Sequence, residues 1–247
     1  MKIGVADYGM NVWYGGCYDY ENRLMDLKDI GYEGIEKLNV QNNSDLVNKS
    51  AKARKLGMDF GTVSAPTPEL SIKWTSAMNK EYIWVSTSPK NKKFNVFCRQ
   101  VNRQAEICKK WNISVALHNH MGTLVETQEQ LESFLEKCPE CMLVLDTAHL
   151  AAVQGVPEEI VRKYPDRIQT VHLKDWILKE PDAENWYERG RFCELGSGNI
   201  DLDNLSVMEA LKDVGFDDWV FIEHDEHKQN PLKDLKISRD YLKKGGY

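Results

Sequence analysis

The amino-acid sequence predicts an α/β protein that folds as a single (β/α)8 TIM barrel over residues 1–247, and three observations predict it. The chain has 247 residues, close to the roughly 250 that a barrel of this kind typically needs. Eight short, β-branched apolar runs alternate with segments of helical periodicity, a pattern typical of a parallel sheet that eight strands can close. No Gly-x-Gly-x-x-Gly motif follows a predicted strand, which disfavours the alternative architecture, a doubly wound open sheet.

The predicted strands come at regular intervals along the chain. Each run is short, apolar and rich in β-branched residues, as strands buried on both faces of a parallel sheet are. They are expected at Ile3–Val5, Tyr32–Leu38, Met58–Val63, Tyr82–Val85, Ile113–Leu117, Met142–Leu145, Ile168–Leu173 and Trp219–Ile222.

The segments between the strands carry helix signals. Asp19 is expected to cap the first helix, which ends at Gly31, and Ser44 to cap the second, which ends at Gly57. Residues 64–81 carry two prolines and little helical periodicity, so the third helix of the barrel is expected to be degenerate. Further helices are expected at Phe94–Trp111, Thr127–Glu136, Pro157–Lys163, Asp203–Val214 and Pro231–Leu242.

The composition is that of an ordinary globular protein and excludes several classes. Apolar residues make up 42% and charged residues 28%, which excludes disordered and collagen-like chains. The net charge of −6 disfavours a nucleic-acid binder, which needs a basic surface. No apolar run approaches the roughly 18 residues that span a bilayer, and the N-terminus shows no signal region. We therefore expect a cytoplasmic protein with no nucleic-acid or membrane partner.

Six cysteines are scattered along the chain, and one pair, Cys138 and Cys141, has the spacing of half a zinc ribbon or of a redox motif. A structural zinc site would need a second such pair. A thioredoxin-like motif would begin a helix, whereas this pair leads into the apolar run Met142–Leu145. We therefore expect these thiols to be ordinary buried or loop cysteines.

Polar side chains gather at the C-terminal ends of the predicted strands, where barrel enzymes place their reacting groups. They are Glu36 (strand two), His118 and His120 (strand five), Asp146 and His149 (strand six), His172 and Lys174 (strand seven), and Glu223, His224 and Asp225 (strand eight). A single such residue is usually a hydrogen-bonded loop residue, but that does not explain their joint placement on neighbouring strands. Carboxylates and imidazoles that converge in a barrel mouth need a compensating cation, and this donor set suits Mn, Co, Zn, Fe or Ni.

These motifs carry a resemblance that covers nearly the whole chain. The xylose isomerase-like TIM barrels have, in the same order, segments like GYEGIEKL, VALHNHMGT, LVLDTAHL, VHLKD, ELGSGNIDL and FIEHDEH. The chain therefore resembles this superfamily of sugar phosphate isomerases and epimerases, which also includes endonuclease IV. HNHMGTLVET followed by LDTAHLA is most similar to the inosose dehydratase-like branch.

The resemblance implies one divalent metal. In the family it is held by an acid from the strand before the LD motif, by the Asp of LD, by the His of VHLKD and by the Glu of the last strand. When the family's pattern is transferred to this sequence, the resemblance implies Asp146, His172 and Glu223 as the last three ligands. The first ligand departs from the family, because His118 stands where Glu is commoner. His118 is the expected ligand, and the alternatives are His120, Glu126 or a site without this ligand.

The two histidines of strand five are two positions apart. Alternate residues of a strand lie on the same face, so a continuing strand would point both towards the barrel mouth. We expect His118 to reach the metal. His120 would then lie near the substrate, where an imidazole is suited to moving a proton.

The resemblance implies an enzyme, namely a divalent-metal-dependent isomerase or epimerase of a keto sugar or related polyol. Manganese is the first candidate metal, followed by Co, Zn, Fe, Ni or Mg. The enzyme would abstract the proton next to a metal-polarised carbonyl to give an enediolate. Catalytic roles fall to His120 or Glu36 as proton carrier, and to Glu223, which is mainly a ligand. The substrate-binding candidates are His149, Lys174, Trp13 and Glu194.

Two segments are expected to shape the pocket for a carbohydrate or cyclitol. Residues 194–202 resemble the family's loop that approaches the substrate, the alternative being a plain turn. Residues 175–191 form an insertion whose aromatic residues, Trp176, Trp186 and Tyr187, would cover a ring-shaped substrate or contact a partner subunit, as in a homo-oligomer. Trp13 would add an apolar wall, although core packing explains it equally well.

Other functions remain open. The first alternative is a lyase that uses the same first step, either an inosose-type dehydratase or a cleaver of oxidised glycosides. The second is a non-catalytic barrel subunit, which is disfavoured because Asp146, His172 and Glu223 are all present. A nuclease of the endonuclease IV type would want more histidines for a three-metal cluster, and the net charge of −6 disfavours it.

Overall fold

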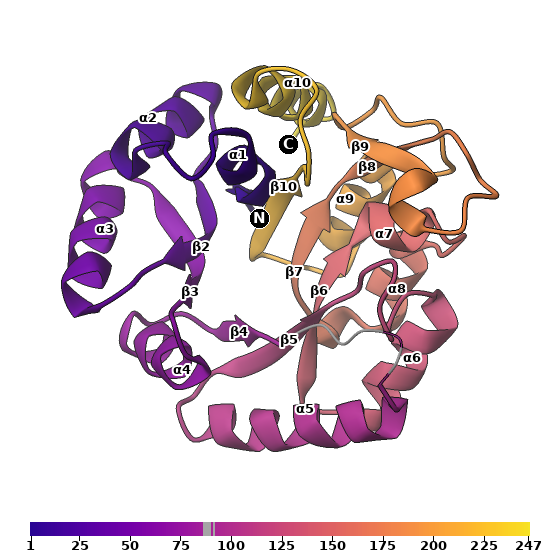
Figure 1. Cartoon of the computed structure of the whole chain (residues 1–247), viewed down its shortest axis with the longest axis horizontal. Helices are drawn as coiled ribbons and strands as arrows, with labels where there is room; N and C mark the ends of the chain where they lie inside the picture. The colour runs from indigo at the N-terminus through magenta and orange to yellow at the C-terminus, as the bar shows by residue number, and fades with distance from the viewer. Residues whose placement is uncertain (86–89, 91) are drawn as a thin grey trace.

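Eight parallel strands form a ring with helices around its outside, in a computed structural model that describes residues 1–85, 90 and 92–247 (Figure 1). In chain order the barrel strands are β1 (Lys2–Ala6), β2 (Gly34–Asn39), β3 (Asp59–Ser64), β4 (Tyr82–Trp84), β5 (Ser114–His118), β6 (Cys141–Asp146), β7 (Ile168–Leu173) and β10 (Trp219–Glu223). In the sheet they lie in the order β3-β2-β1-β10-β7-β6-β5-β4, so the first and last barrel strands are neighbours. Between β3 and β4 the Thr62 hydroxyl donates a hydrogen bond to the Tyr82 carbonyl. The predicted TIM barrel is confirmed.

The helices begin and end close to the residues that favour their termini. They are α1 (Tyr8–Trp13), α2 (Tyr20–Ile30), α3 (Asn43–Leu56), α4 (Pro68–Ala77), α5 (Phe94–Lys109), α6 (Gln128–Lys137), α7 (Thr147–Ala151), α8 (Pro157–Lys163), α9 (Asn204–Asp213) and α10 (Pro231–Lys244), with 3-10 turns η1 (Pro165–Arg167) and η2 (Trp186–Glu188). As predicted, Asp19 caps α2 by accepting a hydrogen bond from the Asn22 amide. Gly31 ends that helix in the left-handed region, at φ 103°.

Two helix predictions are wrong. Ser44 does not cap α3, because the Asn42 side chain does so by accepting a hydrogen bond from the Asp45 amide. The helix between β3 and β4 is not degenerate, since α4 is a regular helix of ten residues. Pro68 stands in its first turn, where the missing N–H would have no partner in any case, and the Thr67 side chain caps it.

Phe221 fills the barrel interior one layer below the C-terminal mouth. Its side chain from β10 is fully buried, and its ring stacks on that of Trp219 with centroids 5.1 Å apart. Two glycines leave room for it: a Cβ at Gly4 would lie 2.6 Å from the ring, and one at Gly61 would lie 2.9 Å from it. The polar residues at the mouth therefore stand on a closed apolar floor.

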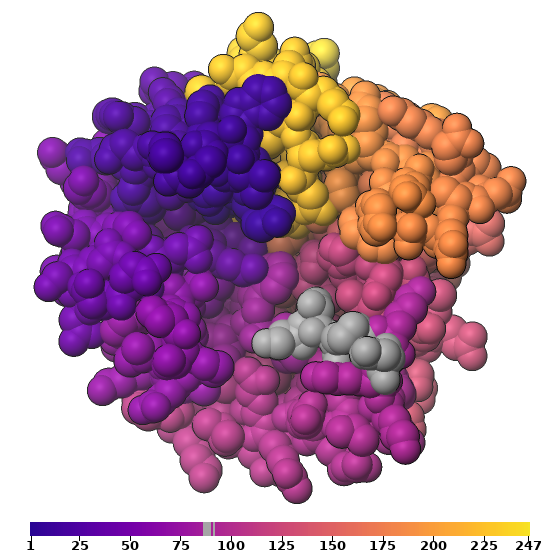
Figure 2. Space-filling view, in the orientation of Figure 1, coloured from indigo at the N-terminus to yellow at the C-terminus, as the bar shows by residue number. Residues whose placement is uncertain are grey.

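The insertion after β7 folds as a hairpin that the sequence did not predict. Its strands, β8 (Asp175–Leu178) and β9 (Gly190–Cys193), pair antiparallel, with η2 between them. Aromatic rings hold it together: the centroids of Trp176 and Phe192 lie 4.7 Å apart, and Trp186 packs against both. Figure 2 shows this orange segment and the indigo N-terminal residues on opposite sides of the mouth.

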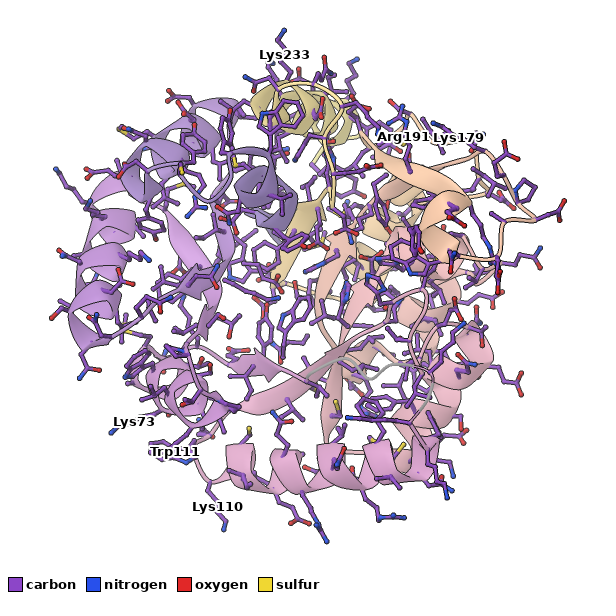
Figure 3. All side chains as sticks on the ribbon, in the orientation of Figure 1. Lys73, Lys110, Trp111, Lys179, Arg191 and Lys233 are labelled. Carbon is purple, nitrogen blue, oxygen red and sulfur yellow. The ribbon has the colours of Figure 1, made fainter. Side chains whose placement is uncertain are left out.

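The outer surface carries charged side chains from the surrounding helices. Figure 3 shows Lys73, Lys110 and Lys233 at the rim, directed away from the barrel, while side chains crowd its interior. Among the described residues, no helix combines the length and the apolar character that crossing a bilayer requires.

Cys138 and Cys141 are free thiols, and both are fully buried. Cys138 ends α6 and Cys141 begins β6. The interpretation of this pair as buried cysteines is confirmed.

Candidate metal centre and active site

Four side chains from four adjacent strands converge at the C-terminal mouth of the barrel. These residues, called the mouth cluster below, are His118 (β5), Asp146 (β6), His172 (β7) and Glu223 (β10). One donor atom from each lies within 4.8 Å of the others. His118 Nε2 is 3.1 Å from Asp146 Oδ2, and His172 Nδ1 is 2.7 Å from Glu223 Oε2. All four are buried, so the convergence is a feature of the strand ends and not of mobile surface loops.

Glu36 on β2 faces the mouth cluster across the barrel. Its Oε1 lies 3.1 Å from His172 Nε2 and accepts hydrogen bonds from Trp84 Nε1 at 2.8 Å and from the Tyr82 hydroxyl at 3.2 Å. The Trp84 ring also stacks on that of His118, with centroids 4.7 Å apart. The sequence analysis missed Tyr82 and Trp84, although their alternation along the predicted strand 82–85 is the signal that both face inward.

The Lys174 ammonium lies among three carboxylates. Its Nζ is 3.1 Å from Asp146 Oδ2, 2.8 Å from Glu223 Oε2 and 3.0 Å from Asp225 Oδ1. Lys174 is only 1% exposed, so these carboxylates and not water compensate its charge. The sequence placed Lys174 at the strand end but did not predict this position within the acidic group.

The charged groups hold one another ionised. Burial acts to lower the pKa of Lys174, but the Asp146 and Asp225 carboxylates raise it well above its ordinary value. Burial acts to raise the pKa of Asp146 and of Glu223, but the Lys174 ammonium holds both well below the usual range. At neutral pH these groups are therefore charged.

The two histidines of the mouth cluster differ in protonation. Burial lowers the pKa of His118 to about 4, and its hydrogen bond to Asp146 offsets only part of this effect. Burial acts in the same direction on His172, but the Glu36 and Glu223 carboxylates raise its pKa to about 10. At neutral pH His118 is therefore a neutral nitrogen donor, whereas His172 carries a proton that a metal ion would replace.

The mouth cluster fits a divalent ion by its charge and its donors. The carboxylates that meet here are Glu36, Asp146, Glu223 and Asp225. They face two cations, Lys174 and protonated His172, and an excess of negative charge remains. Among the described residues, His172 Nε2 is buried with no partner in hydrogen-bond geometry, although Glu36 Oε1 lies 3.1 Å away. Metal binding accounts for an unsatisfied atom of this kind. Two imidazoles and two carboxylates suit Mn, Co, Zn or Fe.

A second group, formed by His120, His149 and Asp225, adjoins the mouth cluster. The rings of His120 and His149 have centroids 3.7 Å apart, and His149 Nε2 is 3.3 Å from Lys174 Nζ. Burial lowers the pKa of His149 to about 4, so it is neutral at neutral pH. His120 Nδ1 donates to the Met121 carbonyl at 2.6 Å, and its other ring nitrogen, Nε2, makes no hydrogen bond to any described residue.

The geometry of strand five favours His118 as the first ligand. The His118 ring centroid lies 5.7 Å from that of His120. His118 belongs to the mouth cluster, whereas His120 belongs to the second group, with His149 and Asp225. Glu126, an alternative ligand, is engaged elsewhere, because it accepts a hydrogen bond from the Gly122 amide at 2.9 Å and pairs with Lys90.

Trp186 from η2 covers the second group. Its ring centroid lies 5.2 Å from that of His120 and 5.7 Å from that of His149. Gly122 permits this approach, because a Cβ there would lie 2.7 Å from the indole. The hairpin thus places an aromatic ring next to the imidazoles, nearly perpendicular to both, where the expected cover for a substrate would lie.

Two other substrate-binding candidates, Trp13 and Glu194, make no direct polar contact with this centre among the described residues and stay predictions. The side chain of Trp13 on α1 is 47% exposed. A different aromatic residue of the same helix, Tyr8, lines a cavity of about 260 Å³ that reaches Glu36. Glu194 accepts a hydrogen bond from Gln229 at 3.3 Å. In residues 1–85, 90 and 92–247, no hydrogen bond or ion pair joins Trp13 or Glu194 to the mouth cluster. The structure therefore brings His149 and Lys174 together, and not these two.

The glycine motif at 194–202 binds the base of the hairpin. The amides of Gly196 and Gly198 donate to Asp175 Oδ2 at 2.9 Å and 3.1 Å. A Cβ at Gly198 would lie 1.9 Å from Asp175 Oδ1, so only glycine permits this approach. The motif thus anchors the segment that carries Trp186.

Comparisons with known proteins agree with this geometry. The sequence profile of the xylose isomerase-like TIM barrel family matches residues 24–245. The inosose dehydratase of Lactiplantibacillus plantarum is 29% identical over 247 residues, which cover 91% of this chain and 78% of that protein. The chain spans about half the length of other curated inosose dehydratases that it matches, such as that of Clostridium tetani.

Solved structures show the same fold. The probable 3-DHS dehydratase AsbF from Bacillus anthracis has a TM-score of 0.74 at 14% identity and covers 98% of this chain and 99% of its own. The IOLI protein, solved with a zinc atom, has a TM-score of 0.70 at 16% identity and covers 99% and 98% of the two chains. The curated relatives carry enzyme names, as expected. Since the family profile matches all but the two ends of the chain, this protein belongs to the xylose isomerase-like TIM barrel family.

Proposed function

We propose that this protein is a divalent-metal-dependent dehydratase of a small keto sugar or keto cyclitol. The observation that carries the proposal is the mouth cluster with His120 beside it, an imidazole whose Nε2 makes no hydrogen bond to any described residue. The named inosose dehydratases support loss of water as the outcome. The sequence analysis ranked this outcome second to isomerisation or epimerisation, which shares the first step.

The four residues of the mouth cluster would hold the ion. A divalent ion bound there supplies a Lewis acid that polarises the substrate carbonyl and acidifies the neighbouring C–H. We favour manganese because a mixed imidazole and carboxylate set suits it, with Co, Zn, Fe or Ni as alternatives. The buried floor beneath, formed by Phe221, keeps water from reaching the ligands from below.

His120 is the better of the two candidate bases. Glu36 accepts hydrogen bonds from Trp84 and Tyr82 and lies against His172, so its Oε1 is already occupied. We assign Glu36 to positioning His172. His120, by contrast, is only partly buried, and its Nε2, which makes no hydrogen bond to any described residue, would take the proton from carbon.

Lys174 and His149 would bind the substrate's oxygens. Lys174 remains protonated because the surrounding carboxylates raise its pKa. Its donors face Asp146, Glu223 and Asp225, so it would donate to a substrate oxygen once a bound ion draws Asp146 and Glu223 towards itself. His149 lies next to it, 3.3 Å away, and is neutral. The indole of Trp186 would contact the apolar face of a ring.

The fate of the proton on His120 separates the two outcomes. Returned to a β-hydroxyl, it lets water depart and gives a dehydrated ketone. Returned to carbon, it gives an isomer or an epimer. Both outcomes begin with the same loss of the α-hydrogen, which the experiment below follows.

The test is proton NMR of manganese-loaded protein in D2O with inososes and keto sugars as substrates. We expect the α-hydrogen signal of one inosose to disappear, with formation of a product lighter by one water in the mass spectrum. A change of configuration without loss of water would assign the isomerase or epimerase. If metal-loaded protein exchanges no α-hydrogen in any of these compounds, the proposal is wrong. A cytoplasmic location and a homo-oligomeric state stay predictions.

A further inference from the structure

Three metal-binding side chains lie on the outer side of β10, between the loop that follows this strand and α10. His224 and His227 belong to the loop, and Asp234 belongs to the first turn of α10. One donor atom from each lies within 4.8 Å of the others. The imidazole centroids are 5.2 Å apart, and His227 Nδ1 is 2.9 Å from Asp234 Oδ2. We call these three residues the rim group.

The rim group is separate from the mouth cluster. His224 directly follows Glu223, but consecutive side chains at the end of a strand point to opposite sides. Accordingly, a ring nitrogen of His224 lies 3.1 Å from the Ser238 hydroxyl on α10. Ser238 also accepts a hydrogen bond from the Leu195 amide at 3.1 Å, which fixes the hydroxyl and, through it, the His224 ring.

The rim group is buried and incompletely paired. The side chains of His227 and Asp234 are 2% and 5% exposed. Among the described residues, Asp234 Oδ1 is buried with no partner in hydrogen-bond geometry, although the Gln229 side chain lies close enough to act on the pKa of this carboxyl. A carboxylate oxygen left unpaired in the interior is costly, so this atom points to a partner beyond the protein groups around it.

The charge around Asp234 is also unbalanced. In the part of the chain that the structure describes, its basic neighbour is the His227 imidazole, 2.9 Å away, and no Lys or Arg lies within ion-pair distance. A second carboxylate, Glu194, borders the same loop through its hydrogen bond with Gln229. A divalent cation would supply both the missing positive charge and the missing partner of Asp234 Oδ1.

We propose that His224, His227 and Asp234 bind a second divalent ion of the zinc type. Two imidazoles and one carboxylate are a donor set typical of zinc, and three protein donors leave a position for water. This inference does not depend on the reaction proposed above, because it concerns a different set of residues.

The ion would join two parts of the barrel rim and fix the loop on which a third part packs. It joins the loop after β10 to α10, and the same loop carries Asp225, a partner of Lys174 at 3.0 Å. Helix α1 packs directly on this loop, since a Cβ at Gly9 would lie 1.9 Å from the His224 carbonyl oxygen. Occupation of the rim group would therefore stabilise the wall of the active site without contacting the substrate.

The test counts zinc in the full-length chain after removal of all metal with a chelator and dialysis against Zn²⁺. We expect two equivalents in the wild type and one in His227→Ala. Asp146→Asn, which removes a ligand from the mouth cluster, should also bind one, and the double variant none. Glu226→Gln is the matched control, because Glu226 is an exposed carboxylate of the same loop and should leave two equivalents.

Asp234→Asn provides a second, more conservative variant, and circular dichroism checks that each protein is folded. Zinc should raise the unfolding temperature of Asp146→Asn and not that of the double variant. Two equivalents in both His227→Ala and Asp234→Asn, or a single wild-type equivalent that Asp146→Asn removes, would overturn the proposal and leave the rim group as a hydrogen-bonded clamp. A single equivalent that His227→Ala removes and Asp146→Asn retains would support the rim site and contradict the metal centre of the proposed function.

Discussion

Asp146→Asn is expected to weaken binding of the catalytic metal by more than roughly a hundredfold, since even residues that only support a ligand are worth about 10–100-fold. The substitution removes a charged oxygen donor from the centre of the mouth cluster. The protein should remain folded, because asparagine keeps an oxygen for the His149 amide that Asp146 caps at 2.9 Å. Lys174 also keeps two other carboxylates, Glu223 and Asp225. Calorimetric titration with Mn²⁺ measures the affinity.

Asp225→Asn is the matched control for this experiment. It removes a carboxylate that also contacts Lys174, but Asp225 lies outside the mouth cluster. We expect its manganese affinity to stay within about tenfold of the wild type, with circular dichroism unchanged in both variants. If Asp146→Asn unfolds the chain or binds manganese as tightly as the wild type, Asp146 is a structural residue and the metal centre is misassigned.

The second large effect is a division of roles between the histidines of strand five. His118→Ala should lose metal affinity, because its neutral imidazole lies 3.1 Å from Asp146 within the mouth cluster. His120→Ala should keep the metal and lose turnover by roughly 10²- to 10⁴-fold, the usual contribution of a general base. It should also lose exchange of the substrate's α-hydrogen with D2O. Metal content and exchange rate are measured on the same preparations.

His118→Phe, which keeps an aromatic ring against Trp84 but removes the nitrogen donor, controls for the loss of stacking. If His120→Ala loses metal while His118→Ala retains it, the two roles are exchanged. If both alanine variants bind metal and turn over normally, strand five is not part of the catalytic centre.

The barrel and its strand ends could be predicted from the sequence because both depend on the order of apolar and polar residues within short segments. Apolar runs and helix stops such as Gly31 mark where elements begin and end, and parallel topology then brings the strand ends together. The degenerate third helix was a mistaken expectation because Pro68 occupies a first turn, which proline tolerates.

Side-chain reach and insertions were harder to predict. Lys174 sits two residues after His172, but only the folded mouth shows that its ammonium lies among three carboxylates. The hairpin has strands of only four residues, which is too short for an alternating pattern to be recognised in the sequence. The contact of Trp186 with His120 therefore depends on tertiary structure that no local pattern encodes.

The burial of the cysteines gives the fold an intrinsic chemical reporter. Cys17 is exposed, whereas the other five thiols are buried. Burial raises the pKa of Cys108 to about 11 and those of Cys141 and Cys193 to about 12, and only the thiolate reacts with alkylating reagents. In the native protein an alkylating reagent therefore modifies Cys17 first and reaches the others only when the barrel opens. The rate at which further labels appear, counted by mass spectrometry, measures how often that opening occurs without any added probe.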